Sequence, residues 1–372
     1  MLSRSPLITI VLGTRPEAIK LAPVIRIFKE TKKIDVRLIL TGQHKEMVLQ
    51  VLDLFNIKAD KDINIMQIGQ SLNDITCRSL QGLFEEYQEN RPDLLLVQGD
   101  TSTTFSAALA AFYQKIPVAH VEAGLRSNEI MNPYPEEVNR RLVSQIASIH
   151  FAPTVKAKQN LIKNGALGDI FVTGNTVIDS LLTIAKENSK LKINGICFNE
   201  KKFILATVHR RENWGEKLES ISIGLKKIVD RFAGITLIIP MHPNLVVRAT
   251  LQRILGNHPR IILVEPLDYK NLVAAIKECE FILTDSGGIQ EEAPSLGKPV
   301  LVLRETTERP EAIEAGAAKL IGTGSIQIFE EASNLITNKE LYESMSKKIN
   351  PFGDGRASHR ILEICLNKLG VE

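Results

Sequence analysis

Three carboxylates stand where acid–base chemistry could be carried out. Asp100 and Glu122 each follow an apolar run, and Glu136 opens a polar segment with helical spacing. An acid at the end of a buried strand needs a partner or a catalytic task, because an uncompensated charge is costly to bury. Such groups together could act as general acids and bases. The structural alternatives are that Asp100 caps a helix and that Glu136 pairs with Arg140, one helical turn later.

Cations and histidines follow other apolar runs. Arg15 and Lys20 lie in a segment that opens with a capping-box sequence, and the N-terminus of such a helix is a natural anion site. His209, whose side-chain type titrates nearest neutrality, is followed by Arg210, which suits phosphate oxygens. His242 follows a later run in the same way. A capped helix with solvated cations explains Arg15 and Lys20 equally well, and a lone histidine is more often structural than catalytic.

A glycine-rich segment in the second half has the composition of a phosphate-binding turn. Ser286, Gly287 and Gly288 offer a hydroxyl and bare backbone amides at the predicted start of a helix. Glu292, one turn later, could accept hydrogen bonds from ribose hydroxyls. The sequence contains no nicotinamide-binding, P-loop, zinc-protease or serine-hydrolase motif, and its four cysteines show no CxxC spacing. We therefore expect a nucleotide-linked small molecule as the ligand, and neither a cofactor nor a metal.

Two doubly wound α/β domains would bring these groups together. Short apolar runs alternate with helix-forming segments through both halves of the chain. The runs are nearly continuous in apolar residues, as parallel strands are when helices cover both faces of their sheet. Such sheets bind ligands beyond the carboxyl ends of their strands, where the polar residues stand. The runs are Leu7–Leu12, Val36–Leu40, Leu94–Val97, Pro117–Val121, Ile149–Ala152, Phe203–Val208, Thr236–Ile239, Ile261–Val264, Phe281–Thr284, Val300–Leu303 and Lys319–Ile321.

The length of 372 residues suits two domains better than one compact core. We expect an N-terminal Rossmann-like domain with the acid–base residues over 1–172, and a C-terminal Rossmann-like domain that binds the nucleotide over 173–356. A last helix within 357–372 is expected to cross back onto the first domain. The two domains would face each other across one cleft.

The overall composition disfavours several classes of protein. Lys and Arg number 46 against 43 Asp and Glu, and the formal charge of +3 is too slight for a nucleic-acid track or an anionic membrane surface. Aromatic residues make up only 5%, which disfavours a protein that grips sugars or bases by stacking. No apolar run approaches the roughly 18 residues of a membrane span, and the N-terminal run is too short for a signal peptide. We expect a cytoplasmic protein without nucleic-acid or membrane partners.

Four motifs together closely resemble the non-hydrolysing UDP-N-acetylglucosamine 2-epimerases. The likeness runs from about Leu7 to Gly353. It implies the glycosyltransferase-B architecture of two Rossmann-like domains, a homodimer, and reversible conversion of UDP-N-acetylglucosamine to UDP-N-acetylmannosamine for polysaccharide biosynthesis. The motifs are Gly13–Lys20, His120–Arg126, Pro135–Arg140 and Asp285–Glu292.

The resemblance also implies a mechanism. The C2 proton of the sugar is not beside a carbonyl, so simple deprotonation would be prohibitively slow. The family instead eliminates UDP from C1 while a base takes the C2 proton, which gives 2-acetamidoglucal, and then adds UDP back with protonation of the other face. Asp100, Glu122 and Glu136 would be the acid–base set. His209 would assist departure of the diphosphate, with Arg15 steadying its charge; which carboxylate serves which face stays open.

Further residues would hold the substrate, as the resemblance implies. Lys20 and Arg140 would belong to the charged network around the carboxylates, with Arg140 orienting Glu136. In the second domain, Ser286, Gly287 and Gly288 would hold the phosphates and Glu292 the ribose. His242 would lie on the nucleotide side of the cleft, and backbone near Phe281 would meet the uracil. Apart from the resemblance, the residue type of Arg210 and its place beside His209 predict a contact with the diphosphate.

Bacterial members of this family can bind a second substrate molecule as an activator. Gln43, His44 and Gln70 match residues near that site. Gly69 lacks the basic side chain that some activated members carry, which leaves activation open. Tyr134 is a second departure, since many relatives have tryptophan at this place.

Three rival functions fit parts of the same pattern. A hydrolysing epimerase would release UDP and N-acetylmannosamine, but Arg15-Pro16-Glu17 favours the non-hydrolysing type. A UDP-sugar-dependent glycosyltransferase would need an acceptor groove and would leave the three acids without a role. A catalytically silent UDP-sugar sensor would be expected to lack Asp100, Glu122 or His209, and all three are present.

Overall fold

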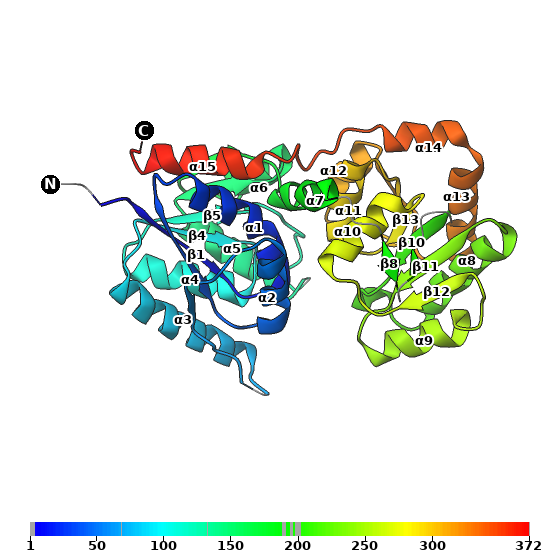
Figure 1. Cartoon of the computed structure of the whole chain (residues 1–372), viewed down its shortest axis with the longest axis horizontal. Helices are drawn as coiled ribbons and strands as arrows, with labels where there is room; N and C mark the ends of the chain where they lie inside the picture. Colours follow the sequence, from blue (N-terminus) through cyan, green and yellow to red (C-terminus); the bar gives the residue numbers. More distant parts are fainter. Residues whose placement is uncertain are drawn as a thin grey trace. The chain divides into compact units, whose positions relative to one another are not determined.

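The chain forms two compact units, each built on its own parallel sheet (Figure 1). Unit 1 is made of Met1–Ser180 and Phe352–Glu372, and unit 2 is made of Leu181–Pro351. The division falls inside helix α7 (Thr176–Lys186), somewhat later than the boundary expected at 172. Strands and helices alternate in both units, which confirms the expected pair of Rossmann-like α/β folds. The computed structural model describes residues 4–67, 69–131, 133–187, 191–193, 196–197 and 202–371.

The sheet of unit 1 has the strand order β3-β2-β1-β4-β5-β6-β7, and all of its pairs are parallel. The five apolar runs predicted in this half correspond to β1, β2, β4, β5 and β6. The edge strands β3 and β7 lack an apolar run because they are short and lie partly exposed. The strands are β1 (Leu7–Leu12), β2 (Asp35–Leu40), β3 (Lys61–Asp62), β4 (Leu94–Gln98), β5 (Val118–Val121), β6 (Ile149–Ala152) and β7 (Asp169–Val172).

The last helix, α15 (Ala357–Lys368), lies in unit 1 and packs against α1 (Figure 1). Asp179 of α7 caps its N-terminus, since the carboxylate accepts hydrogen bonds from the backbone N–H groups of Ala357 (3.2 Å) and Ser358 (2.8 Å). These contacts fasten the C-terminal segment to the unit. The other helices of unit 1 are α1 (Arg15–Glu30), α2 (Lys45–Leu54), α3 (Leu72–Glu89), α4 (Ser102–Tyr113), α5 (Glu136–Ile146) and α6 (Val155–Lys163).

The larger sheet of unit 2 has the order β12-β11-β10-β13-β14-β15, again with parallel pairs. Its strands are β10 (Phe203–Thr207), β11 (Thr236–Pro240), β12 (Ile261–Val264), β13 (Ile282–Thr284), β14 (Val300–Val302) and β15 (Ala318–Leu320), and β8 (Lys192–Ile193) pairs separately with β9 (Ile196–Cys197). The helices are α8 (Glu216–Arg231), α9 (Leu245–Leu255), α10 (Tyr269–Glu278), α11 (Gly287–Glu292), α12 (Pro310–Glu314), α13 (Ser325–Thr337) and α14 (Lys339–Ser346), with short 3-10 turns η1 (Arg211–Asn213) and η2 (Ala293–Leu296).

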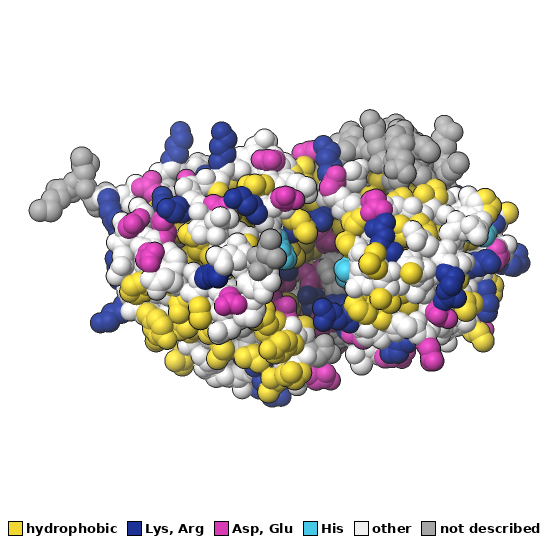
Figure 2. Space-filling view, turned by 90° about the horizontal axis from the view of Figure 1, so that it is seen from below, with side chains coloured by type: hydrophobic (Ala, Val, Ile, Leu, Met, Phe, Trp, Pro, Cys, Tyr) yellow, Lys and Arg dark blue, Asp and Glu magenta, His cyan; other side chains and the backbone are white. Residues whose placement is uncertain are grey.

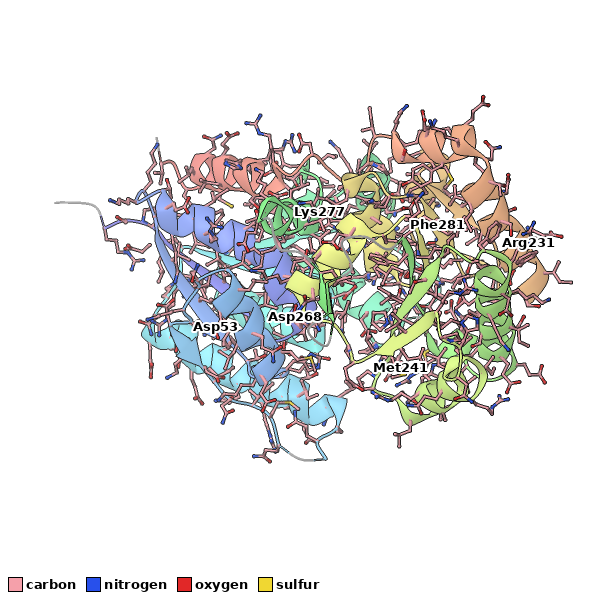
Figure 3. The ribbon with its side chains drawn as sticks, turned by 45° about the vertical axis from the view of Figure 1, so that its right-hand side comes forward. Asp53, Arg231, Met241, Asp268, Lys277 and Phe281 are labelled. Carbon is pink, nitrogen blue, oxygen red and sulfur yellow. The ribbon has the colours of Figure 1, made fainter. Side chains whose placement is uncertain are left out.

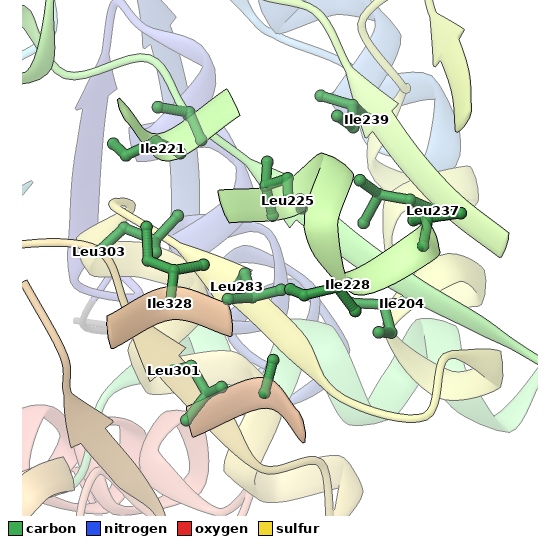
Figure 4. Close-up of a cluster of buried hydrophobic side chains, with 14 of the residues drawn as sticks. Ile204, Ile221, Leu225, Ile228, Leu237, Ile239, Leu283, Leu301, Leu303 and Ile328 are labelled. Atoms are coloured by element: carbon green, nitrogen blue, oxygen red, sulfur yellow. The ribbon is translucent and has the colours of Figure 1, made fainter. Parts of the chain in front are cut away.

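A buried aliphatic cluster holds this unit together (Figure 4). Ile221 and Leu225 of α8 and Ile328 of α13 meet strand residues such as Leu237 and Leu301, all of them buried. Branched side chains on two helices thus cover one face of a continuously apolar sheet, and burial of this surface drives the packing.

Glu17 joins two turns at the carboxyl edge of the unit 1 sheet. Its Oε2 accepts hydrogen bonds from the backbone N–H groups of Gly13 and Thr14, both at 2.7 Å. Its Oε1 accepts a hydrogen bond from Thr104 Oγ1 at 2.9 Å. The first two contacts close the turn between β1 and α1, as the capping-box sequence predicts, and the third reaches the helix after β4. Because Glu17 is buried, these contacts fix the two polar turns beside each other.

Charged side chains of both signs are interspersed over the face of the molecule seen in Figure 2. This distribution agrees with the small formal charge of +3. Within the described ranges, no helix combines the length and apolar character that crossing a membrane would require.

Gly124 occupies a position that a side chain does not fit. Its φ is +94°, and a Cβ there would lie 2.2 Å from the carbonyl oxygen of Ala157 in α6. Gly165 is a matched control, because its φ is +67° but a Cβ would meet no atom within 4 Å. We expect Gly165→Ala to lower the free energy of unfolding by about 1 kcal/mol through backbone strain. Gly124→Ala should lower it by about 3 kcal/mol or more, because a backbone segment must also move.

Urea unfolding followed by circular dichroism measures both variants. Equal losses of stability at the two positions would contradict the proposed clash with Ala157.

Candidate active site

Glu122 lies at the end of β5 with its carboxylate held on several sides. Lys20 Nζ is 2.7 Å from Oε1 and 2.6 Å from Oε2. Asn175 Nδ2 donates a hydrogen bond to Oε1 at 3.2 Å, and Gln98 Nε2 donates one to Oε2. The Glu122 side chain is only 4% exposed, so these contacts compensate a buried charge. Sequence reasoning missed Gln98 and Asn175, although Gln98 is the last residue of β4 and Asn175 lies in the polar loop after β7.

Asp100 follows β4 and is fastened to helix α5. Arg140 NH2 donates a hydrogen bond to Asp100 Oδ2, while its NH1 donates one to Glu137 Oε2 at 3.2 Å. Asn139 Nδ2 donates a hydrogen bond to the backbone carbonyl of Asp100 at 3.0 Å. Arg140 therefore contacts Asp100 and Glu137 rather than Glu136, the partner that we expected it to orient.

Glu137, which sequence reasoning missed, is the fully buried acid of α5. It accepts hydrogen bonds from the backbone N–H of Ser127 at 3.0 Å and from Arg141 Nε at 2.8 Å. Burial alone would raise the pKa of Glu137, but the contacts with Ser127 and Arg141 and the charge of Arg140 hold it below its ordinary value. The available signal was the one-turn spacing of Glu137 and Arg141. Glu136, by contrast, is the first residue of α5 and is partly exposed.

Asp100 and Glu122 follow neighbouring strands, so the fold brings their turns together. The backbone N–H of Gly99 donates a hydrogen bond to the carbonyl of Val121 at 3.1 Å. His120 Nε2 lies 2.7 Å from the carbonyl oxygen of Gly99. Burial lowers the pKa of His120 to about 3, so this histidine is neutral and donates to that carbonyl. It is a structural support behind the Gly99 turn.

Arg15 begins α1 directly after β1 and its turn, and is partly exposed. Two of the residues that match an activator site lie near the same turn. Gln43 Oε1 accepts a hydrogen bond from Thr103 Oγ1 at 3.1 Å. The backbone N–H of His44 donates a hydrogen bond to the carbonyl oxygen of Gly13, in the turn after β1, at 2.8 Å. Gln70 lies in a different loop, just before α3, where its Oε1 accepts a backbone hydrogen bond at 2.6 Å.

In unit 2, His209 follows β10 and its Nδ1 lies 2.9 Å from Oδ1 of Asp285, which follows the neighbouring strand β13. Asp285 is fully buried. His242, after β11, stacks on His209 with ring centroids 6.0 Å apart and planes inclined by 22°. Burial lowers the pKa of His242, and the nearby His209 lowers it further. The strand order thus brings together two histidines predicted from separate motifs.

The glycine-rich segment begins helix α11 after β13. A Cβ on Gly288 would meet only Ser286 Oγ at 3.9 Å and Glu292 Oε2 at 4.0 Å, so the backbone there has open space beside it. Glu292 is buried one turn later, and its Oε1 accepts a hydrogen bond from the Tyr269 hydroxyl at 3.0 Å.

Arg210 is held by Glu308, an acid that sequence reasoning passed over. Arg210 NH2 and Arg304 NH1 both donate hydrogen bonds to its carboxylate. This carboxylate borders the glycine segment, since a Cβ on Gly287 would lie 3.1 Å from Glu308 Oε1. Burial alone would raise the pKa of Glu308, but the charges of Arg309, Arg210 and Arg304 lower it to about 2. Glu308 is therefore ionised and balances part of this cationic cluster.

Phe281 belongs to the buried core of unit 2, together with Met241 (Figure 3). The whole residue is only 1% exposed, so the Phe281 side chain is not available to a ligand.

Comparison with known proteins places these features in a family. A profile of the family described as UDP-N-acetylglucosamine 2-epimerase matches residues 26–366. A UDP-N-acetylglucosamine 2-epimerase of Bacillus subtilis is 49% identical over 364 residues, which cover 97% of this chain and 95% of the relative.

Solved structures give the same result. The UDP-GlcNAc 2-epimerase of Neisseria meningitidis, bound to UDP-GlcNAc, has a TM-score of 0.88 and 46% identity, and the match covers 97% of this chain and all (100%) of that chain. The S. aureus protein MnaA, in a co-structure with UDP, has a TM-score of 0.91 and 44% identity, with coverage of 99% and 98%. These matches extend through both units, and the chain belongs to the UDP-N-acetylglucosamine 2-epimerase family.

Proposed function

We propose that this protein interconverts UDP-N-acetylglucosamine and UDP-N-acetylmannosamine without hydrolysis, by eliminating UDP and adding it back. Membership of the family supports the substrate class and the 2-epimerase activity. The observation that carries the proposal is the pair of carboxylates, Asp100 and Glu122, that follow neighbouring strands, each in contact with a cation. Epimerisation at C2 needs groups that take a proton from C2 and return one to it, whereas transfer of the sugar to an acceptor leaves the C2 proton in place.

The reaction has two balanced halves. In elimination, a base removes the C2 proton, the C2–H electron pair forms the C1–C2 double bond of 2-acetamidoglucal, and the C1–O pair leaves with UDP. In re-addition, a diphosphate oxygen attacks C1 and an acid protonates C2 from the opposite face. Because the proton leaves and returns on different faces, two acid–base groups are required.

Unit 1 would supply these groups. Glu122 is in contact with the Lys20 ammonium, which favours the ionised carboxylate, and that is the form able to accept a proton. Asp100 and Glu136 are the candidates for the other face. Arg140 would position Asp100 through their ion pair, which is largely buried on the arginine side.

Unit 2 would bind the UDP portion. His209, His242 and the glycine segment from Ser286 all follow strands of one parallel sheet, and such strand ends are where α/β sheets bind their ligands. His209 and Arg210 would meet the diphosphate with the amides of Gly287 and Gly288, and Arg15 would add a further charge. Glu292 would accept hydrogen bonds from the ribose, with backbone near Phe281 at the uracil.

The same family resemblance supports a homodimer that works in the cytoplasm and supplies precursors for polysaccharides. Analytical ultracentrifugation of the purified protein measures the oligomeric state directly.

Incubation with UDP-N-acetylglucosamine in deuterated water tests the proposed reaction. We expect NMR to show UDP-N-acetylmannosamine with deuterium at C2, because the proton returned to C2 comes from a group that exchanges with solvent. Free N-acetylmannosamine as the main product would instead indicate hydrolysis, and unchanged substrate would indicate a transferase or a sensor.

Glu122→Gln tests the assigned base. The amide cannot accept the C2 proton, so we expect the rate of deuterium exchange at C2 to fall by about 10³-fold. The dissociation constant for UDP, measured by calorimetry, should change by less than about threefold, a difference of under 1 kcal/mol.

Glu86→Gln is the matched control. Glu86 is a buried acid in α3 that is also paired with a cation, Arg37, at 2.6 Å, but it does not follow a strand. This variant should retain exchange, and retained exchange in Glu122→Gln would remove Glu122 from the mechanism.

A further inference from the structure

Asp285 receives donors from a single loop of unit 2, the one that carries His209. Its Oδ2 accepts hydrogen bonds from the backbone N–H groups of His209 (3.0 Å) and Arg210 (2.9 Å) and from Asn213 Nδ2 (3.0 Å). Its Oδ1 lies 3.1 Å from the backbone N of His209 and 2.9 Å from Nδ1 of the same residue. Asn213 Nδ2 is anchored in turn by the carbonyl of Leu303 at 3.1 Å.

These contacts determine which nitrogen of His209 carries a proton. An ionised carboxylate only accepts hydrogen bonds, so Nδ1 beside it must be the donor. Burial alone would raise the pKa of Asp285, but the hydrogen bond and charge of His209 and the amides of Arg210 and His209 hold it below its ordinary value. The neutral imidazole of His209 therefore has its proton on Nδ1 and a lone pair on Nε2.

The neighbouring histidine has the opposite arrangement. His242 Nδ1 accepts a hydrogen bond from the backbone N–H of Asn244 at 3.2 Å, which places its proton on Nε2. Its pKa is lowered by burial and by His209, which favours the neutral form of His242. The two stacked rings thus carry their protons on different nitrogens, and of the two only His209 forms an ion pair with a carboxylate.

We propose that Asp285 is the positioning residue that keeps the His209 proton on Nδ1 and so leaves Nε2 as the nitrogen that exchanges a proton with the diphosphate. The catalytic part of this assignment rests on the proposed epimerase function. In elimination, the His209 imidazolium would give its Nε2 proton to a phosphate oxygen of the departing UDP and become the neutral Nδ1–H form. In re-addition Nε2 would take that proton back, so the charge and the proton balance.

Asp285→Asn separates this role from a purely structural one. The position of Oδ2 has three donors around it, so the asparagine oxygen should settle there and its NH2 group should face His209 Nδ1. Nδ1 must then accept, and the proton moves to Nε2. In a serine protease, the corresponding aspartate-to-asparagine change lowers kcat by about 10⁴-fold because the histidine takes the wrong tautomer. For Asp285→Asn we expect kcat to fall by at least about 10²-fold. The dissociation constant for UDP should change by less than about threefold.

The ¹⁵N NMR spectrum of protein labelled in its seven histidines reads the tautomer directly, with His209→Gln used to assign the signals. In the wild-type protein we expect neutral His209 to carry its proton on Nδ1, and in Asp285→Asn on Nε2. Asp179→Asn is the matched control. Asp179 is a buried acid that accepts hydrogen bonds from two backbone N–H groups of α15, and neither of these hydrogen bonds involves His209 or His242. It should lower stability and leave the His209 signals and kcat unchanged.

A double-mutant cycle decides whether Asp285 acts through His209. In the His209→Gln background, Asp285→Asn should lower kcat by less than about twofold, whereas a structural role would give the full additional loss. Wild-type His209 with its proton on Nε2 would overturn the proposal, as would a shifted tautomer with unchanged kcat or additive losses in the cycle. The tautomer is read without turnover, so failure of the epimerase assignment and failure of this inference are told apart.

Discussion

A carboxylate buried at the end of a parallel strand must be compensated by nearby donors, and each unit of this protein arranges its polar edge around one such group. In unit 1 the group is Glu122, which lies against the Lys20 ammonium and two side-chain amides. In unit 2 it is Asp285, whose donors come from the loop that follows β10. Elements from distant parts of the sequence are held at these edges because they satisfy these two charges.

The same requirement fixes the cations. Arg140 is paired with Asp100 and Glu137, and Arg210 is paired with Glu308. A charged ligand would therefore meet groups whose directions are already set, which is the condition under which electrostatic stabilisation of a transition state is most effective. The near balance of 46 basic and 43 acidic residues is consistent with a chain that pairs its buried charges internally.

Continuity of apolar residues predicts the central strands, because those strands are buried on both faces. It does not predict the edge strands β3 and β7, whose partial exposure removes the need for apolar side chains. The sequence also predicts which charged and polar residues stand at the strand ends. It does not predict which side chains they pair with through hydrogen bonds and ion pairs. Asp285 and His209 lie far apart in sequence and meet only because β10 and β13 pair in parallel. Arg140 likewise finds Asp100 through tertiary packing, although its spacing in the sequence favours Glu136.

Elimination requires that the bond between C1 and the diphosphate oxygen breaks each time the sugar is epimerised. UDP-N-acetylglucosamine that carries ¹⁸O in the bridge between C1 and the β-phosphorus tests this claim most directly. Released UDP can rotate its terminal phosphate before it adds back, so ³¹P NMR should show the label spreading to non-bridging β-phosphate oxygens of the recovered sugar nucleotides. Epimerisation with the label retained wholly in the bridge would contradict elimination.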